Sequence, residues 1–421
     1  MCFARLQKGI LYYKLIQKGD YDMTALSLTE SEELKVKQIK NHIHQYPELS
    51  WEEYETTVYI RNVLATLDGI EFLDDILGNG IKEGQTSATG VVAMLKGTTP
   101  GKTIALRADI DALAANEETD VELKSRIPGK AHTCGHDFHT AALLGTAMIL
   151  SRIRKELVGN VIFIFQPAEE TTDGAGKMIE AGLFEKTSID MLFGFHNRPE
   201  IETGKVVVKN GPLMASKDKF KITLHGVSAH GSMPHKGTDP IVCAASMIQA
   251  LQTVSSRNTD PFEPIALSIG SIHGGVQENL IPNELEMTGS IRIFDPTSHT
   301  RAIERVETIV KMIAESYECG WNLEWQESLP ALINPEPMYQ TAKRAVTTAL
   351  GEDAIVDSQP TLATEDFSLF MQKVPAFFYW IGNRKSGDTC YSWHNTKFHA
   401  DNDALKIASA VMAQSVIEAN R

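Results

Sequence analysis

Short apolar runs alternate with helical segments through the first half of the chain, and this pattern limits the fold more than any other feature. Each run is shorter than a normal helix and is bounded by turn residues, as strands buried on both faces of a sheet are. The runs are residues 90–95, 103–106, 161–165, 191–195 and 205–208. An Ala- and Leu-rich helical segment, residues 140–153, separates the second run from the third. We therefore predict an α/β domain around a mainly parallel sheet.

Helical patterns extend this domain at both ends. Residues 30–46 and 53–67 carry apolar residues at helical spacing, and Thr29 or Ser31 is a suitable N-cap for the first of these helices. The final part of the chain resumes the α/β pattern. It is expected to hold helices over residues 337–350, 366–372 and 402–419 and a strand over residues 377–381.

The order of elements changes near Met214. The next patterns follow as β-α-β-β-α-β, over residues 219–224, 240–254, 265–272, 285–293, 300–318 and 322–326. This order predicts an inserted ferredoxin-like α+β domain that can cover an active site as a lid. A chain of 421 residues is also long enough for two domains. We place the domains at residues 24–213 (catalytic, first part), 214–328 (lid) and 329–421 (catalytic, second part), with residues 1–23 as an unassigned extension.

Composition excludes several classes of partner. The formal charge of −14 is spread along the chain and no Lys/Arg run stands out, so neither nucleic acid nor an anionic membrane is an expected partner. Apolar runs fall short of the ~20 residues of a membrane span, and the N-terminal segment has no signal-peptide pattern. The five cysteines are few and scattered, which favours a reducing compartment and a cytoplasmic location.

Ligand-type side chains follow the apolar runs. Asp109 comes after the second predicted strand, Glu169 and Glu170 after the third, and His196 after the fourth. The loop with Cys134 and His136 opens the helix between two of these strands. Because the carboxyl ends of parallel strands meet at one edge of a sheet, we expect these groups to converge there.

The residue types in this set point to metal-assisted hydrolysis. A thiolate and an imidazole suit Zn²⁺ or a similar ion, and Glu170 can complete the ligand shell. Glu169 would then be available to act on water. Taken alone, Cys134 and His136 are better explained by a buried thiol beside a loop histidine. His196 and His394, each taken alone, are better explained by hydrogen-bonded histidines in structural roles.

Five segments together resemble the M20 metallopeptidases, and specifically their amidohydrolase branch of hippurate hydrolases, N-acyl-amino-acid deacetylases and auxin-conjugate hydrolases. The opening at residues 44–50 is similar to the start of that branch, and the resemblance runs from about Glu30 to the C-terminus. The segments are residues 105–113, 132–139, 166–170, 194–196 and 364–368.

The resemblance implies a two-metal site and a residue that moves protons. Glu169 matches the general acid/base, and Asp109, the second expected catalytic residue, matches the aspartate of the family's His-x-Asp signature, in which Arg107 replaces the histidine. The ions are expected to be Zn or Mn, with Co and Ni also open, and the thiolate favours the softer ion. The sequence does not decide which ligand bridges the two ions. The implied ligands are Cys134, His136, Glu170, His196 and His394.

The lid contributes by the same resemblance. His230 is expected to reach an active site, often that of a partner subunit, and therefore implies a homodimer formed through the lid. Asn279 and Arg292 match residues that contact substrate, and an Arg can hold a carboxylate by two parallel hydrogen bonds. The sequence departs from the family pattern at residues 228–230, which read Ser-Ala-His rather than Gly-Gly-His, and at residues 112–115, which lack the usual proline.

The expected reaction is hydrolysis of an N-acyl amino acid to a carboxylic acid and a free amino acid. A dipeptidase or carboxypeptidase with the same metals is the alternative within the family, and its substrate would be a dipeptide. A different mechanism would use Cys134 as nucleophile with His136 or His139 as base, but it leaves Glu169 and Glu170 without a role. A non-enzymatic metal-dependent binding protein on the same fold is the third alternative.

Overall fold

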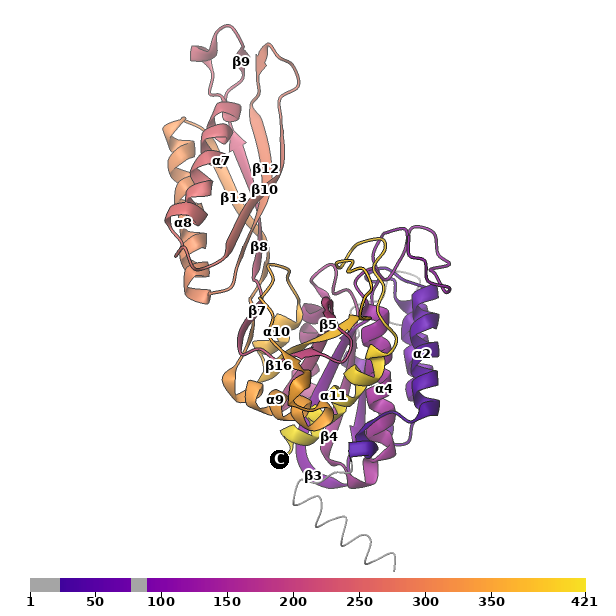
Figure 1. Cartoon of the computed structure of the whole chain (residues 1–421). Helices are drawn as coiled ribbons and strands as arrows, with labels where there is room; N and C mark the ends of the chain where they lie inside the picture. The colour runs from indigo at the N-terminus through magenta and orange to yellow at the C-terminus, as the bar shows by residue number, and fades with distance from the viewer. Residues whose placement is uncertain (1–22, 77–88) are drawn as a thin grey trace, which may run out of the picture. The chain divides into compact units, whose positions relative to one another are not determined.

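The computed structural model describes residues 23–76 and 89–421, which form two compact units (Figure 1). The larger unit holds the described residues up to Lys209 together with residues 335–358 and 370–421. The smaller unit holds residues 210–334 and 359–369. Nearly all of the predicted N-terminal extension, residues 1–22, lies outside the described residues.

An eight-stranded sheet forms the centre of the larger unit, in the order β1-β2-β4-β3-β5-β16-β6-β15. Neighbours β4, β3, β5 and β16 are all parallel, whereas β1 and β2 add an antiparallel edge. The strands are β1 (Ile70–Phe72), β2 (Val91–Lys96), β3 (Thr99–Asp109), β4 (Val158–Gln166), β5 (Met191–Glu202), β6 (Val206–Val207), β15 (Ile355–Val356) and β16 (Ala376–Arg384). The prediction of a mainly parallel sheet is confirmed.

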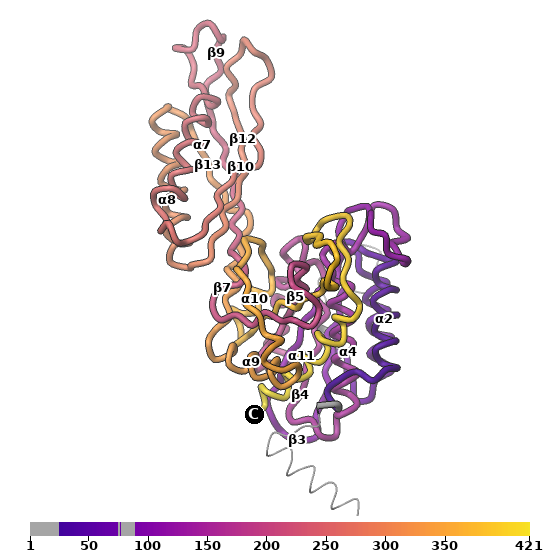
Figure 2. The backbone as a smooth tube through the Cα atoms, in the orientation of Figure 1, coloured from indigo at the N-terminus to yellow at the C-terminus, as the bar shows by residue number. Residues whose placement is uncertain are grey.

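Helices pack around this sheet, and α4 contacts both α11 and α2 (Figure 2). In α2, Thr29 accepts a hydrogen bond from Glu32 N while the Glu32 carboxylate accepts one from Thr29 N, so Thr29 rather than Ser31 is the cap. The C-terminal Asn420 accepts a bond from Lys102 N and so ties the chain end to β3. The helices are α2 (Glu30–Gln45), α3 (Tyr54–Leu64), α4 (His136–Arg152), α5 (Gly174–Glu180), α6 (Leu183–Thr187), α9 (Glu336–Leu350), α10 (Phe367–Met371, partly in the smaller unit) and α11 (Ala404–Ala419).

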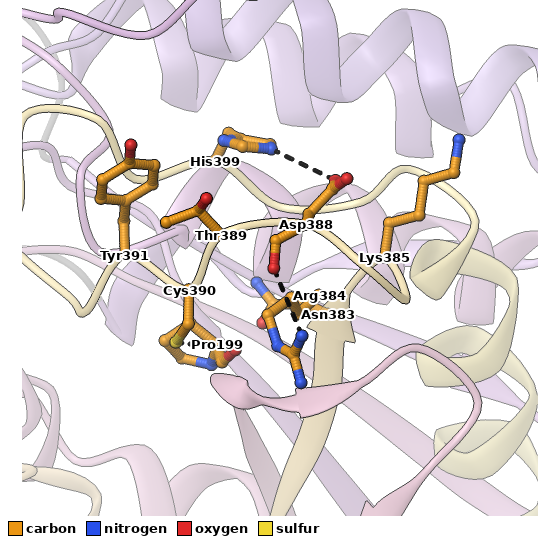
Figure 3. Close-up of a pocket in the computed structure, with 9 residues that line it drawn as sticks. All are labelled: Pro199, Asn383, Arg384, Lys385, Asp388, Thr389, Cys390, Tyr391 and His399. Carbon is orange, nitrogen blue, oxygen red and sulfur yellow. Dashed lines mark hydrogen bonds and ion pairs between the residues drawn. The ribbon is translucent and has the colours of Figure 1, made fainter.

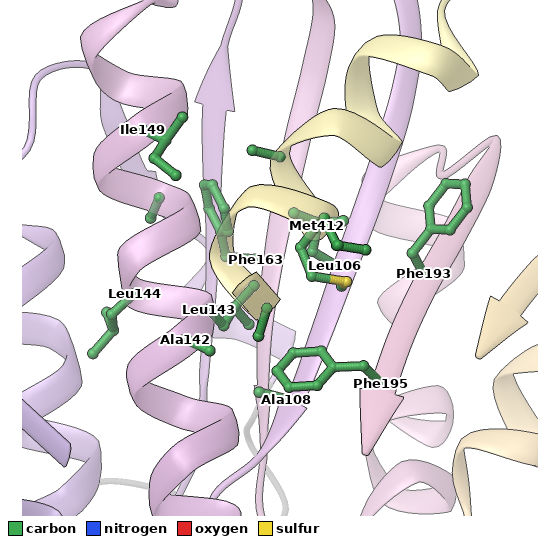
Figure 4. Packing of buried hydrophobic residues seen from close by; sticks show 14 of the residues in the cluster. Leu106, Ala108, Ala142, Leu143, Leu144, Ile149, Phe163, Phe193, Phe195 and Met412 are labelled. Carbon is green, nitrogen blue, oxygen red and sulfur yellow. The ribbon is translucent and has the colours of Figure 1, made fainter. Parts of the chain in front are cut away.

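The core of the larger unit lies between the sheet and helices α4 and α11 (Figure 4). Leu106 and Phe163 from the strands pack with Leu143 of α4 and Met412 of α11. Every residue of α4 from His136 to Leu150 is buried, which explains why its sequence is rich in Ala and Leu rather than amphipathic. A rigid, fully enclosed helix therefore begins at the predicted ligand loop.

The smaller unit is a four-stranded antiparallel sheet in the order β10-β12-β8-β13, with α7 and α8 in contact with each other. Asp239 and Asp295 cap the two helices, and each helix has Pro at its first position, where the missing N–H costs nothing. The predicted β-α-β-β-α-β order is confirmed. Its elements are β8 (Lys217–His225), α7 (Pro240–Arg257), β10 (Ile265–Gly274), β12 (Glu284–Ile293), α8 (Pro296–Ser316) and β13 (Gly320–Leu329).

The chain segment 359–369 belongs to the smaller unit, although the sequence pattern placed it with the second part of the α/β domain. Thr361 bridges to Met214 in parallel and accepts a hydrogen bond from Ala215 N. Arg292 Nη1 donates to Leu362 O at 2.7 Å. These contacts join residues that are far apart in sequence, so no local pattern indicates them. Among the described residues, no helix is both long and apolar enough to cross a membrane.

Candidate metal centre

The Cys134-Gly135-His136 turn sits at the start of α4 and brings two predicted ligands to the carboxyl edge of the sheet. Gly135 has a φ of 96°, in the left-handed region that favours glycine. A Cβ there would lie 2.3 Å from Asn197 Nδ2. Glycine therefore lets the thiol turn approach the middle of β5, where Cys134 Sγ is 3.4 Å from His196 Nε2.

All five side chains predicted as metal ligands come together in the larger unit. Their potential ligand atoms form overlapping groups in which the atoms lie within 4.8 Å of one another. One group is Cys134, His136 and His196, and another is Cys134, Glu170 and His394. Glu169 and Glu170 form a third group with His136. The thiol and Glu170 thus link all members of the cluster.

Two of these atoms are buried without a hydrogen-bond partner in the described structure. They are His136 Nε2 and Glu170 Oε1, which lie 3.8 Å apart. A buried polar atom with no partner costs about 1–3 kcal/mol, so natural folds rarely keep two of them together. Their chemistry, an imidazole nitrogen and a carboxylate oxygen beside a thiol, is that of a divalent-cation site. The residues present therefore fit such an ion.

Hydrogen bonds orient both buried histidines of the predicted ligand set. His136 Nδ1 lies 3.1 Å from Asp111 Oδ1, and His196 Nδ1 donates to Asn197 O at 2.8 Å. In each ring the Nδ1 proton is therefore held by an oxygen, and the Nε2 lone pair points into the cluster. Neither Asp111 nor Asn197 was singled out from the sequence. The only signal was their position beside other site residues, in Asp109-Ile110-Asp111 and His196-Asn197.

The charges in the cluster call for a cation. Burial, together with Glu170 and Glu169, raises the pKa of the Cys134 thiol well above its ordinary value. Burial opposes protonation of His136, but Asp109 and Asp111 outweigh it and raise its pKa to about 10. Burial and the neighbouring His139 hold the pKa of His196 well below its usual range. A bound divalent ion would supply the missing positive charge and deprotonate the thiol.

Asp109 lies in the cluster, but both of its oxygens are engaged. Oδ1 is 2.6 Å from His139 Nδ1, and Oδ2 accepts from Arg107 Nη1 at 2.8 Å. Burial disfavours the Asp109 carboxylate, but His136, His139 and Arg107 outweigh it and hold the pKa well below its usual range. Arg107, which replaces the histidine of the family signature, also donates to Gln166 Oε1. Its guanidinium group is therefore fixed within the sheet.

Glu169 sits on a tight turn after β4. Ala168 has a φ of 54°, a left-handed conformation that costs a residue with a side chain about 1–2 kcal/mol. Hydrogen bonds hold the turn: Ala168 N donates to Glu53 Oε1 at 2.8 Å, and Glu170 N donates to Asp111 Oδ2 at 3.0 Å. The turn places the buried Glu169 beside Glu170, with both carboxylates in the cluster.

Glu53 is a buried carboxyl group under this turn that the sequence did not indicate. Its Oε2 is buried without a partner in the described residues, and it lies on no motif. Burial, followed by the charge of Asp111, raises the pKa of Glu53 to about 8. The side chain is therefore mostly a neutral acid at neutral pH, which suits its position beside the Asp111 carboxylate.

The raised pKa of Glu53 predicts a pH-dependent stability. Between about pH 4.5 and 8 the folded protein holds a proton that the unfolded chain has released, so the free energy of unfolding falls as pH rises through this window. Glu53→Gln keeps an acceptor for Ala168 N and removes the titration. We expect its free energy of unfolding, measured by denaturant titration at each pH, to fall less than the parent's across this window, by a margin on the order of a few kcal/mol. Exposed Glu55→Gln is the matched control, and parallel curves for parent and Glu53→Gln would contradict the assignment.

His394 reaches the cluster from the loop after β16. Its side chain is 57% exposed, and its Nε2 is 3.3 Å from Glu170 Oε2. Its backbone has a φ of 65°, and its N–H donates to Thr133 O at 2.8 Å. His394 is thus the one exposed member of the predicted ligand set, and it is attached by its backbone to the thiol turn.

The predicted substrate residues all lie in the smaller unit. Strand β9 (Ala229–His230) pairs with β11 (Leu280–Ile281), and Gly231 N donates to Asn279 O at 2.8 Å. His230 and Asn279 are therefore neighbours, and both are exposed. Arg292 is near the C-terminal end of β12, away from this pair of strands, so the unit does not bring it to His230 and Asn279.

The larger unit also has a surface cavity of about 260 Å³, a volume that includes open solvent (Figure 3). Arg384 donates to the Asp388 carbonyl, and Asp388 faces His399. No predicted site residue lines it. The lining residues are Pro199, Asn383, Arg384, Lys385, Asp388, Thr389, Cys390, Tyr391 and His399.

Comparison with known proteins identifies the family. Residues 105–418 match the family described as Peptidase family M20/M25/M40, and this stretch contains every residue of the clustered ligand set. The chain belongs to peptidase family M20. The predictions of an M20 amidohydrolase fold and of a hydrolase acting on amide bonds are both confirmed.

Relatives with different activities resemble this M20 hydrolase to similar extents. N-acetyl-L-cysteine deacetylase of Bacillus subtilis (strain 168) is 39% identical over 377 residues, covering 90% of this chain and 86% of the deacetylase. Thermostable carboxypeptidase 1 of Saccharolobus solfataricus is 37% identical over 380 residues, covering 89% of this chain and 93% of the carboxypeptidase. A crystal structure from Bacillus subtilis, described as a dinuclear metal binding peptidase of the M20 family, matches with a TM-score of 0.79 at 35% identity. It covers 93% of this chain and 98% of that one.

Proposed function

We propose that this M20 hydrolase cleaves N-acyl amino acids to a carboxylic acid and a free amino acid. The observation that carries the proposal is the cluster of a thiol, three imidazoles and Glu170, in which two potential ligand atoms are buried without a hydrogen-bond partner and Glu169 lies beside them. The likeness to a deacetylase of N-acetyl-L-cysteine supports the acyl-amino-acid class of substrate.

In the proposed mechanism Cys134, His136, Glu170, His196 and His394 would hold two divalent ions, Zn or Mn, with Co or Ni as alternatives. When bound, these ions would supply positive charge that acidifies water and polarises the substrate carbonyl. Glu169 removes a proton from the attacking water and then delivers it to the leaving amine. Asp109 has both oxygens occupied, so we assign it to orienting His139 rather than to the reacting atoms.

The smaller unit would supply the remaining groups. His230 is a candidate donor to the oxyanion, an interaction that strengthens in the transition state. Arg292 is a candidate partner for the carboxylate of the amino acid, and Asn279 for its amide. We also propose a homodimer formed through this unit, because it exposes apolar side chains at Ile241 and Val242. The four cysteines of the described residues are all free, which supports a reducing cytoplasmic environment.

A carboxypeptidase or dipeptidase is the second candidate, favoured by the 37% identity to a thermostable carboxypeptidase. A panel of N-acetyl amino acids, N-benzoyl amino acids and unblocked dipeptides, compared by kcat/KM, separates the two candidates. We expect the N-acyl amino acids to be cleaved most efficiently. Preference for the unblocked dipeptides would overturn the proposal in favour of the second candidate.

A further inference from the structure

Asn197, a buried residue directly after His196 on β5, connects three of the proposed metal ligands. We propose that Asn197 is a positioning residue that sets the spacing of Cys134, His196 and His394, and so tunes metal affinity without touching metal or substrate. The inference rests on the proposed metal site.

Asn197 holds the thiol turn through its side chain. Nδ2 donates to Cys134 O at 2.6 Å and also lies 2.9 Å from His139 Nε2. The close packing of Gly135 against this amide leaves the turn no room to shift toward β5. The Asn197 amide therefore fixes the position of the Cys134 backbone relative to the sheet.

The backbone of Asn197 orients two histidines. Its carbonyl accepts the Nδ1 proton of His196 at 2.8 Å, which fixes the tautomer with Nε2 directed at the cluster. Its N–H donates to His139 Nε2 at 2.9 Å, and His139 Nδ1 in turn meets Asp109. His139 is thereby fixed as a structural link rather than a free base.

The third connection runs to the loop that carries His394. Trp393 Nε1 lies 3.2 Å from both the carbonyl and Oδ1 of Asn197. The Trp393 ring contacts His196 edge-on, with centroids 4.7 Å apart, and Arg198 lies over it at 4.7 Å. His394 follows Trp393 directly in the sequence, and its own side chain is mostly exposed. The contact between Trp393 and Asn197 therefore helps to hold His394 in place.

The side chain of Asn197 is itself held by a residue of the neighbouring strand. Asn383 Nδ2, on the adjacent strand β16, donates to Asn197 Oδ1 at 3.1 Å. With its oxygen held by Asn383 and Trp393, the amide cannot rotate to exchange its donor and acceptor ends. Only an asparagine-sized side chain with both a donor and an acceptor meets these contacts, which is why we assign the role to this residue.

The test compares metal binding of the parent with that of Asn197→Ala and Asn197→Asp, measured by competition with a chelator for Zn²⁺. We expect the affinity to fall by about 10–100-fold, as when a group that supports a metal ligand is lost. In cobalt-loaded protein the thiolate-to-metal absorption band should shift. Asn420→Ala, which also removes a side-chain partner within the larger unit, is the matched control and should lower thermal stability alone.

Trp393→Phe provides a second variant that keeps the ring and removes the donor to Asn197. We expect it to weaken binding of one ion of the pair and leave the cobalt–thiolate band of Cys134 in place. If Asn197→Ala and Asn197→Asp do not fold, unchanged metal affinity in Trp393→Phe overturns the inference. Parent affinity together with an unchanged cobalt spectrum in Asn197→Ala overturns it directly.

These outcomes separate the inference from the proposed function. A parent that binds the ions but hydrolyses no N-acyl amino acid overturns the proposed function, while the metal-affinity comparison still decides the role of Asn197. A parent that hydrolyses N-acyl amino acids, while Asn197→Ala equals it in both metal affinity and cobalt spectrum, overturns the inference alone.

Discussion

Glu169→Gln should lower kcat by at least about 10²–10⁴-fold, the usual contribution of a general acid/base. The amide has nearly the same size as the carboxylate but cannot take a proton from water at neutral pH. Glu169 is buried beside the proposed ligand Glu170, on a turn held by Glu53 and Asp111, so the substitution should leave the backbone in place. Steady-state kinetics on an N-acetyl amino acid give kcat and KM separately.

Two measurements exclude loss of metal and the general loss of a carboxylate as causes of a lower kcat. The metal content of Glu169→Gln should equal that of the parent, because the proposed ligand set does not include Glu169. Exposed Glu180→Gln on α5 serves as the control for removing a carboxylate and should retain full activity. A Glu169→Gln protein with the kcat of the parent would refute the proton-transfer role.

Removal of divalent ions should reduce activity by about 10³-fold, since such ions supply several kcal/mol of transition-state stabilisation. The reason lies in the two unpartnered atoms, His136 Nε2 and Glu170 Oε1, whose chemistry needs a cation. Activity is measured after treatment with a chelator and again after addition of Zn²⁺ or Mn²⁺. We expect recovery with at least one of these ions.

The same experiment tests the alternative in which Cys134 is a nucleophile. That mechanism needs a base, but His139 Nδ1 faces Asp109 and its Nε2 accepts from Asn197 N, so both ring nitrogens are engaged. His136 is likewise held by Asp111 at Nδ1. Cys134→Ser should weaken metal binding, and exposed Cys390→Ser is the matched control. Full activity after metal removal, lost only on alkylation of the thiol, would favour the alternative.

The sequence predicted those parts of the molecule that depend on local pattern. The short apolar runs identified the central strands, because burial on both faces leaves a continuous apolar run. The β-α-β-β-α-β order identified the smaller unit, since its alternating strands and capped helices carry their own signals. The clustering of Cys134, His136 and Glu170 followed from their positions after neighbouring parallel strands.

What the sequence did not predict depends on contacts between distant residues. Asn197 and Glu53 lie on no motif, and their importance comes from hydrogen bonds to Cys134 O and Ala168 N. Asn and Glu are common on protein surfaces, so the residue type alone does not distinguish a buried side chain that holds several groups from a solvated one. The fully engaged carboxylate of Asp109 likewise depends on Arg107 and His139 folding against it.

The position of β16 within the sheet has a consequence for biosynthesis. This strand, Ala376–Arg384, pairs between β5 and β6, which precede it by well over a hundred residues, and His394 follows it. A nascent polypeptide lacks the strand until translation has passed Arg384, and it lacks the histidine until translation has passed His394. The growing chain therefore cannot assemble the full proposed ligand set before both segments have been made.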